Sequence, residues 1–256
     1  MPERGLKPAE RACIEAILRQ VPWIWKWRMA EMLLFVEAVY HVMRTGIPWA
    51  DLPEKFGNWE TQRRRYRRWA ERGIWERIFL AVSPDNDCPE ALLADSTACK
   101  VHRCALGDPE AAIGKTRGGH NTKVHVGVEP DGTVRTEVLT AGNVSDCLVM
   151  KDTLGGLRPL RVIADKGYDT DRCRRDVREA GAVPVIPYRE NRRNKHPVQR
   201  RSYRKRHKVE NFFAPFKDFT RVSLRRDKSD GSYWGFVMFA VAIINMRLGW
   251  TTVLGV

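Results

Sequence analysis

Two short apolar runs, each followed by an aspartate, constrain the fold of this 256-residue chain more than any other feature. Residues 91–94 (Ala-Leu-Leu-Ala) lead into Asp95, and residues 160–164 lead into Asp165. Apolar runs of this length are typical of strands in a sheet that is covered on both faces. The two runs therefore predict two interior strands, each ending at an acidic residue.

The segments around these runs predict the rest of an α/β domain. Alternating valines before Pro130-Asp131-Gly132 and the apolar residues after this turn indicate a hairpin. Helices are expected over 145–154 and 170–180, and a last short strand over 183–186. The predicted order is strand, hairpin, helix, strand, helix, strand and terminal helices, which is an α/β fold.

Asp95 and Asp165 become neighbours if their strands are adjacent and parallel, because adjacent strands lie about 4.8 Å apart. Two carboxylates about 4 Å apart repel by roughly 4 kcal/mol at an effective dielectric constant near 20. A proton on one acid, or divalent cations between them, would relieve this repulsion. Oxygen ligands favour Mg²⁺ or Mn²⁺ over zinc. The alternative is that each aspartate is only a turn residue at a strand end.

A third acid lies in the basic segment 203–217. In a continuous helix, Tyr203, Arg206, Glu210 and Lys217 share one stripe about 60° wide. Glu210 is suited to binding a metal ion, and the two cations are suited to binding phosphate; the alternative is an ordinary solvated face. Pro215 removes a backbone donor and predicts a kink, which would move Lys217 off the stripe.

Residues 1–84 read as a small helical module. A helix over 29–44 that stops at Gly46, a second helix after Asn58 and a third over 75–82 suit a helix-turn-helix-like DNA-binding module. The second helix carries Arg64 and Arg68 as candidate DNA contacts, although a solvated basic helix is the alternative. Residues 85–90 read as a linker, and 91–256 as the second domain.

The charge balance points to a polyanionic partner, because 45 Lys and Arg face 31 Asp and Glu, a net charge of +14. Ten basic residues lie between 189 and 208, next to Glu210. Arg204 and Lys208 in this run, together with Tyr203, Arg206 and Lys217, are candidate DNA contacts. The 114–123 loop adds further cations, and its spacing is not that of a P-loop.

Location and redox state follow from simpler features of the chain. The first residues have no apolar signal core, and the apolar stretch 233–248 is too short and too polar to span a bilayer. The six cysteines form no CxxC pair and are expected to be reduced packing residues. A cytoplasmic, nucleoid-associated protein is therefore expected, with no membrane partner.

Several motifs together resemble one family. They are Y-x-x-R-x-x-x-E-x(6)-K (Tyr203, Arg206, Glu210, Lys217), D-S-T (95–97), D-K-G-Y-D (165–169), G-N-V-S-D (142–146), RTGIPWADLPEKFGNW and RRYRRWAERGIWERIF. Over residues 29–248 the chain resembles bacterial insertion-sequence transposases of the DDE superfamily, in the IS-four/IS-five group.

The resemblance implies a ribonuclease H-like catalytic domain in which Asp95, Asp165 and Glu210 form the catalytic, metal-binding triad. It also implies two divalent ions, Mg²⁺ or Mn²⁺, that support an in-line displacement at phosphorus. The expected partners are the double-stranded ends of the element and the target DNA, and pairing of two ends makes a homodimer on DNA the expected assembly.

The expected activity is strand cleavage followed by strand transfer, as in cut-and-paste transposition. Three alternatives stay open at this point. They are a metal-dependent nuclease that cuts without joining, a decayed copy that only binds DNA through residues 29–82, and, least favoured, a protein that binds anionic membranes.

Overall fold

The computed structural model describes residues 5–24, 26–192, 195 and 200–249. The chain forms two compact units. The sheet unit comprises residues 85–100 and 112–214, and the helical unit comprises residues 1–84, 101–111 and 215–256. The linker at residues 85–90 stays a prediction. Each compact unit is made of several separate segments of the chain, so the units do not correspond to the two predicted domains.

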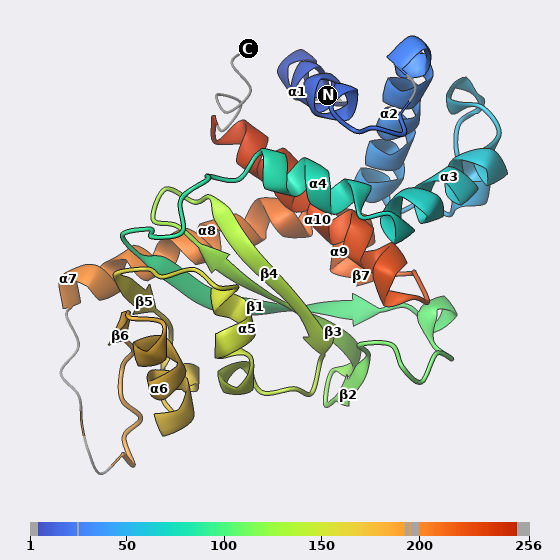
Figure 1. Cartoon of the computed structure of the whole chain (residues 1–256). Helices are drawn as coiled ribbons and strands as arrows, with labels where there is room; N and C mark the ends of the chain where they lie inside the picture. Colours follow the sequence, from blue (N-terminus) through green and yellow to red (C-terminus); the bar gives the residue numbers. More distant parts are fainter. Residues whose placement is uncertain (1–4, 25, 193–194, 196–199, 250–256) are drawn as a thin grey trace. The chain divides into compact units, whose positions relative to one another are not determined.

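The sheet unit is built on a mixed sheet with β1 (Leu92–Val101) at its centre (Figure 1). β3 (Gly119–Val128) pairs antiparallel with β1 on one side, and β5 (Arg161–Ile163) pairs parallel with β1 on the other. Three further strands of the sheet unit are β2 (Gly114–Thr116) and β4 (Val134–Ala141), both antiparallel to β3, and β6 (Val183–Val185), parallel to β5. This mixed sheet with flanking helices is consistent with the predicted ribonuclease H-like fold.

β1 is longer than the sequence predicts. The apolar run ends before Asp95, but the strand continues to Val101 because residues 96–100 keep pairing with residues 121–125 of β3. Beyond Asp95, Thr97 and Cys99 are buried whereas Ala98 and Lys100 are exposed. Asp95 therefore lies inside a strand, next to the point where the parallel pairing with β5 ends.

Two short helices bury one face of this sheet. α5 (Met150–Leu154) and α6 (Asp171–Glu179) contact each other, and their apolar side chains join a cluster with Leu92, Ala94 and Val162. The predicted helix over 145–154 is divided, because residues Asp146–Leu148 form a 3₁₀ turn before α5 begins. The predicted helix over 170–180 is confirmed, with Thr170 capping its first turn.

The segment 203–217 is not one continuous helix. It consists of α7 (Arg200–Tyr203), the 3₁₀ turn η7 (Arg204–Arg206) and α8 (His207–Lys217). Like charges four residues apart, such as Arg201 and Lys205, disfavour a regular α-helix here. α8 runs through Pro215 and ends at Lys217, so Pro215 does not terminate the helix.

The predicted basic loop over 114–123 is instead the β2–β3 hairpin, so that prediction is wrong. The Asn121 side chain donates to Thr116 Oγ1 at 2.7 Å and to the Gly119 carbonyl at 2.9 Å, which closes the hairpin. Gly119 adopts a positive φ of 98°, a conformation that side chains disfavour. The local hydrogen bonds of this turn explain why a glycine-rich segment is ordered.

The helical unit combines N-terminal helices with the end of the chain. Its helices and strand are α1 (Pro8–Arg19), α2 (Met29–Thr45), α3 (Trp59–Glu71), α4 (Ile74–Ala81), α9 (Thr220–Ser223), β7 (Leu224–Arg225) and α10 (Asp230–Arg247). Its short 3₁₀ turns are Lys26–Arg28, Trp49–Asp51, Glu54–Phe56 and Arg103–Ala105.

The predicted helix stop and helix cap are both confirmed. Gly46 ends α2 with φ 72°, and the Asn58 side chain accepts hydrogen bonds from the Glu60 and Thr61 amides at the start of α3.

α10 forms the core of the helical unit, where it contacts α1, α3 and α4. Aromatic side chains fill this core: the rings of Tyr66 and Phe236 stack at 4.4 Å between centroids, and those of Trp75 and Phe239 lie 4.9 Å apart. No helix in the described part of the chain is both long and apolar enough to cross a membrane.

The cysteine prediction holds only in part. Cys13, Cys99 and Cys173 are buried, whereas Cys88 and Cys104 are exposed. The packing role is therefore wrong for these two exposed thiols.

Candidate active site

Two predicted catalytic residues meet in the sheet unit because β1 and β5 are parallel neighbours. Leu93 is paired with Ile163, and Asp95 and Asp165 each lie two residues beyond this pair. The Asp95 side chain is only 16% exposed. The condition set in the sequence analysis, adjacent and parallel strands, is thus met, and Asp95 and Asp165 follow these strands on the same side of the pairing.

The Asp165 carboxylate is oriented by the turn that follows β5. Its Oδ1 accepts a hydrogen bond of 2.7 Å from the Gly167 amide, at the start of the 3₁₀ turn Lys166–Tyr168. A Cβ on residue 167 would lie 2.8 Å from this same oxygen, closer than real Cβ contacts. The glycine of the D-K-G-Y-D motif therefore leaves room for the aspartate to bond to the backbone.

Arg206 joins the first and third predicted acids. It donates to Asp95 Oδ2 at 2.9 Å and to Glu210 Oε1 at 2.7 Å. Glu210 is 57% exposed, so its outer side faces solvent. A single guanidinium thus connects a strand residue with a helix residue 115 positions later in the chain.

Burial and neighbouring charges act on these groups in opposite directions. Burial raises the pKa of the Asp95 carboxyl; the Ser96 amide and Arg206 oppose this rise, and Asp165 and Asp146 add to it. Burial alone would lower the pKa of Arg206, but Asp95, Tyr203, Glu210 and Asp165 together raise it. Arg206 therefore serves as the countercharge of an acidic cluster.

Two tyrosines lie beside the same carboxylates. Burial and the charges of Asp146, Asp95 and Asp165 raise the pKa of Tyr168 well above its usual value. The Tyr168 hydroxyl is buried and finds no hydrogen-bond partner among the described residues. Burial also raises the pKa of Tyr203, where Arg206 opposes the effect of the three acids. The predicted DNA contact Tyr203 is therefore close to the acidic cluster.

Asp146, from the G-N-V-S-D motif, approaches the site from the start of the turn before α5. Lys123 donates to Asp146 Oδ1 at 2.8 Å, and the buried His125 has its Nδ1 3.8 Å from the same oxygen. Burial lowers the pKa of His125 to about 4, so this histidine is neutral near pH 7. Lys123, one of the cations of the segment 114–123, is thus paired with Asp146.

Asp169, the second aspartate of D-K-G-Y-D, is buried and stabilises the local fold. Asp169 is 4% exposed, accepts from Arg174 at 2.8 Å, and accepts from the Arg189 amide at 2.7 Å. These bonds attach the start of α6 to the chain after β6. Asp169 supports the site without belonging to the carboxylate cluster.

Carboxylate oxygens are the ligand type that a hard divalent cation prefers, but the carboxylates of this site are not positioned to coordinate one ion together. Among the described residues, no three His, Cys, Asp or Glu side chains are grouped closely enough to hold a metal ion. Nevertheless, within the described chain, Asp165 Oδ2 and Glu210 Oε2 have no hydrogen-bond partner, and both residues reach solvent. An all-oxygen donor set of this kind fits Mg²⁺ or Mn²⁺.

The other predicted DNA contacts are distributed over both units. Arg204 and Lys208 are exposed beside the acidic cluster, whereas Lys205 pairs with Glu90 at 3.3 Å. Lys217 ends α8 and belongs to the helical unit. Part of the basic run, residues 193–194 and 196–199, lies outside the described residues.

Arg64 and Arg68 lie on the exposed side of α3. The opposite side of this helix buries Gln62, Tyr66 and Trp69. α3 is therefore an amphipathic helix with an arginine-rich outer face, as predicted. Whether it enters a DNA groove stays a prediction.

The spacing in the sequence identified Glu210 and Arg206, but not the ion pair between them. The i, i+4 separation of these opposite charges is the spacing of a helical ion pair, and it is the signal that indicates this contact. Sequence analysis also did not identify Tyr168 as a neighbour of the carboxylates. Its position depends on the turn Lys166–Tyr168, which lies within the D-K-G-Y-D motif, so the motif itself was the available signal.

Comparison with known families covers most of the chain. Residues 12–79 match the family described as "Putative transposase of IS4/5 family (DUF4096)", and residues 86–245 match the family described as "Transposase DDE domain". Residues 80–85 separate the two matches, and the linker at residues 85–90 stays a prediction.

Curated relatives agree with these matches. The chain is 33% identical over 128 residues to "Putative transposase for insertion sequence element IS6501" of Brucella ovis, covering 49% of this chain and 98% of the relative. It is 27% identical over 169 residues to "Putative transposase for insertion sequence element IS402" of Burkholderia cepacia, covering 61% and 78%. "Uncharacterized protein y4sN" of Sinorhizobium fredii is 34% identical over 96 residues, covering 38% and 72%. No solved structure matches the chain.

Proposed function

Because the chain belongs to the DDE transposase domain family, we propose that it binds the ends of its own insertion sequence, cleaves the DNA strands there and joins them to target DNA. The observation that supports this proposal is the link of each predicted acid to its neighbour in the sheet unit. The first two acids are aligned by parallel strands, and the third shares Arg206 with Asp95.

In this proposal Asp95, Asp165 and Glu210 hold two Mg²⁺ or Mn²⁺ ions. When bound by these acids, the ions would supply activation of the attacking oxygen and stabilisation of the leaving oxygen in an in-line displacement at phosphorus. Arg206 keeps the acids paired in the absence of substrate, and is near enough to turn toward a backbone phosphate. The Gly167 amide holds Asp165 in a fixed orientation.

The exposed basic side chains near the acids bind phosphates of the DNA backbone. Arg204 and Lys208 reach solvent next to Glu210, and Tyr203, Arg206 and Lys217 complete the contacts that the family motif implies. Arg64 and Arg68 on α3 supply contacts from the helical module. A homodimer pairs the two ends of the element, so each active site receives one end.

Asp165→Asn tests the catalytic assignment with little disturbance of the local turn. The amide oxygen of asparagine can still accept the Gly167 hydrogen bond, but the side chain no longer carries a charge for a metal ion. We expect DNA affinity to change by less than about threefold while Mg²⁺-dependent nicking of an end-bearing duplex falls by more than about 10³-fold, the scale lost with an essential catalytic group. Asp171→Asn, an exposed acid on α6, is the matched control and should cleave like the wild type.

Nicking by Asp165→Asn near the wild-type rate would reject the triad. A separate assay with precut ends distinguishes the remaining candidates. Joining of these ends to target DNA supports a transposase, whereas cutting without joining identifies a nuclease. DNA binding without Mg²⁺-dependent cleavage by the wild type identifies a copy that only binds DNA.

A further inference from the structure

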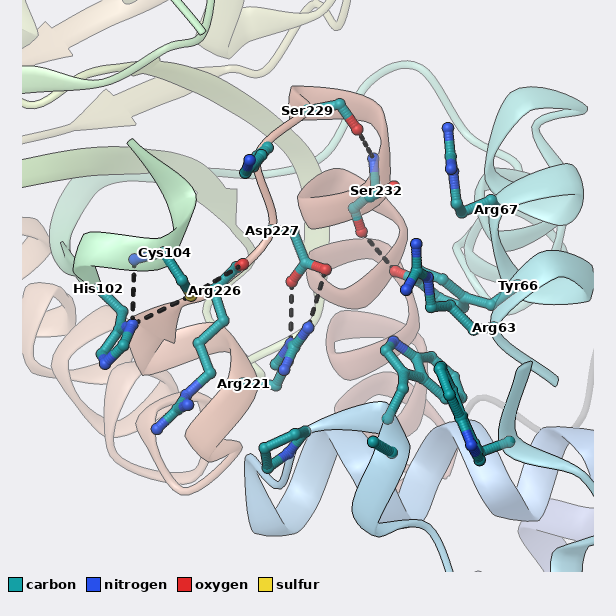
Figure 2. A pocket seen from close by; sticks show the side chains of 15 residues that line it. Arg63, Tyr66, Arg67, His102, Cys104, Arg221, Arg226, Asp227, Ser229 and Ser232 are labelled. Carbon is teal, nitrogen blue, oxygen red and sulfur yellow. Dashed lines mark hydrogen bonds and ion pairs between the residues drawn. The ribbon is translucent and has the colours of Figure 1, made fainter. Parts of the chain in front are cut away.

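The helical unit contains a pocket of about 660 Å³ that none of the catalytic residues lines. It lies between α3, the loop before α10 and the 3₁₀ turn at residues 103–105 (Figure 2). Pockets of this size accommodate small organic ligands or single nucleotides. The carboxylate cluster does not account for this pocket, although the motif RTGIPWADLPEKFGNW contributes Pro48, Trp49, Ala50 and Trp59 to its wall.

The pocket has a strong surplus of positive charge. Arg63, Arg67, Arg226 and Lys228 line it, and none of these four forms an ion pair with any residue in the described part of the chain. Its acid Asp227 accepts two hydrogen bonds from Arg221, at 2.9 and 3.0 Å, which neutralise its charge (Figure 2). The pocket therefore favours an anionic ligand.

Its remaining walls are apolar and aromatic. Trp59, half-buried, and the buried Trp49 line it together with Pro48 and Ala50. Tyr66 also lines the pocket, but its hydroxyl is already bonded to the Ser232 carbonyl. An aromatic surface beside free cations is the combination that binds a base by stacking and its phosphate by charge.

We propose that this pocket holds an unpaired nucleotide of a DNA strand, with its base against Trp59 and its phosphates near Arg63, Arg67 and Lys228. A base inside a duplex must first be unpaired and unstacked before it can enter a concave pocket, so a single-stranded segment is the favoured ligand. The proposal rests on the proposed function only in that a cleaved end supplies such a segment.

The pocket contains a natural reporter of its occupancy. Cys104 is exposed and lines the pocket; its Sγ lies 3.0 Å from His102 Nδ1 and 3.6 Å from the Arg226 carbonyl oxygen (Figure 2). Cys88, in the sheet unit, is also exposed and serves as the internal reference. A nucleotide in the pocket should shield the first thiol and leave the second accessible.

The first experiment measures alkylation of wild-type protein by N-ethylmaleimide, followed by mass spectrometry of each cysteine. We expect a duplex with a short single-stranded tail to slow alkylation of Cys104 by about 10-fold or more relative to Cys88. The same duplex with a blunt end should have little effect. The proposal would be overturned if Cys104 is alkylated at the same rate in the complexes with tailed and blunt DNA.

The second experiment measures affinity for the same two DNAs by fluorescence anisotropy, in the Asp165→Asn background so that no cleavage occurs. Arg63→Ala/Lys228→Ala should reduce the preference for tailed over blunt DNA by about 10-fold. It should also lower the salt slope on tailed DNA by about 0.7 for each phosphate that is no longer neutralised. Arg72→Ala, an exposed arginine just after α3 and outside the pocket, is the charge-matched control and should leave the preference unchanged.

A third variant separates stacking from charge. Trp59→Leu should weaken binding of the tailed DNA by about 5- to 100-fold without altering the salt slope, as expected for loss of one stacked base. An unchanged preference in both variants, with melting temperatures close to the wild type, would overturn the proposal. Because the background is cleavage-deficient, these results do not depend on whether the chain cuts DNA.

Discussion

Arg206 donates one hydrogen bond to Asp95 and another to Glu210, so its positive charge offsets carboxylates that would otherwise repel. A divalent cation bound by the same acids has to compete with this guanidinium for their oxygens. The side chain that stabilises the metal-free site therefore also opposes metal binding, and DNA phosphates offer it an alternative partner. Under the proposed function, this one residue would therefore couple DNA binding to metal binding.

Removing the Arg206 charge should tighten metal binding in the absence of DNA. For Arg206→Gln we expect at least about a 10-fold lower Kd for Mn²⁺, because a unit charge about 4 Å away contributes several kcal/mol even at an effective dielectric constant near 20. The measurement is a titration of free Mn²⁺ by electron paramagnetic resonance. Arg204→Gln, a neighbouring exposed arginine, should bind Mn²⁺ like the wild type, and an equal or weaker affinity in Arg206→Gln would contradict the countercharge role.

The raised pKa of Asp95 predicts how stability changes with pH. A carboxyl whose folded-state pKa is raised destabilises the fold where the unfolded chain is ionised, and the penalty disappears as the pH falls below the unfolded pKa near 3.9. Asp95→Asn should therefore raise the Tm of the metal-free protein at pH 7, by about 2–4 °C for each kcal/mol relieved. Calorimetry at pH 7 and at pH 4 should show the gain shrinking at the lower pH; a gain that grows on acidification would contradict the argument.

At the scale of elements, strongly periodic or clearly capped segments could be predicted from the sequence. The helix from Met29, its stop at Gly46, the cap at Asn58 and the parallel neighbours β1 and β5 are all as expected. These features depend on local chemistry or on an uninterrupted apolar run. The same local reasoning also identified the β3–β4 hairpin around the turn Pro130-Asp131-Gly132.

Features that depend on long-range pairing could not be predicted. β1 extends past Asp95 because β3 offers it partners, and no apolar run marks residues 96–101. The break at Arg204–Arg206 and the bridge from Arg206 to Asp95 likewise need the sheet to be in position. The pocket residues Arg63 and Arg226 are far apart in the chain, so no spacing rule relates them.

The turn after β5 offers a test of how an element positions a catalytic group. Gly167→Ala should displace the Asp165 carboxylate, because the new Cβ would lie 2.8 Å from its Oδ1. We expect Mg²⁺-dependent cleavage to fall by about 10²-fold, the scale of an ångström-sized misplacement, with little change in Tm. Gly231→Ala, where an added Cβ meets nothing within 4 Å, is the matched control for Tm and cleavage. Full activity in Gly167→Ala would show that the turn does not orient Asp165.

At the scale of the whole molecule, the net charge of +14 predicts a steep dependence of DNA binding on salt. If about 6–10 phosphates are neutralised, affinity for duplex DNA should fall by about 10³ to 10⁵-fold between about 50 and 200 mM salt. Arg64→Ala/Arg68→Ala should lower the slope of log K against log salt by about 0.9 for each phosphate left without its arginine, whereas Lys151→Ala on α5 should not change it. A wild-type DNA affinity that does not change with salt concentration would exclude binding dominated by phosphate neutralisation.

The core of the helical unit joins residues near both ends of the chain, because α10 packs against α1, α3 and α4. During translation, the early helices leave the ribosome long before the segment that completes their interior has been made, and the whole sheet unit is synthesised in between. A ribosome that stops before residue 230 would therefore release aromatic side chains such as Tyr66 and Trp75 without their Phe236 and Phe239 partners. Prematurely terminated copies of this gene product are consequently expected to be substrates for chaperones and proteases rather than free-standing DNA binders.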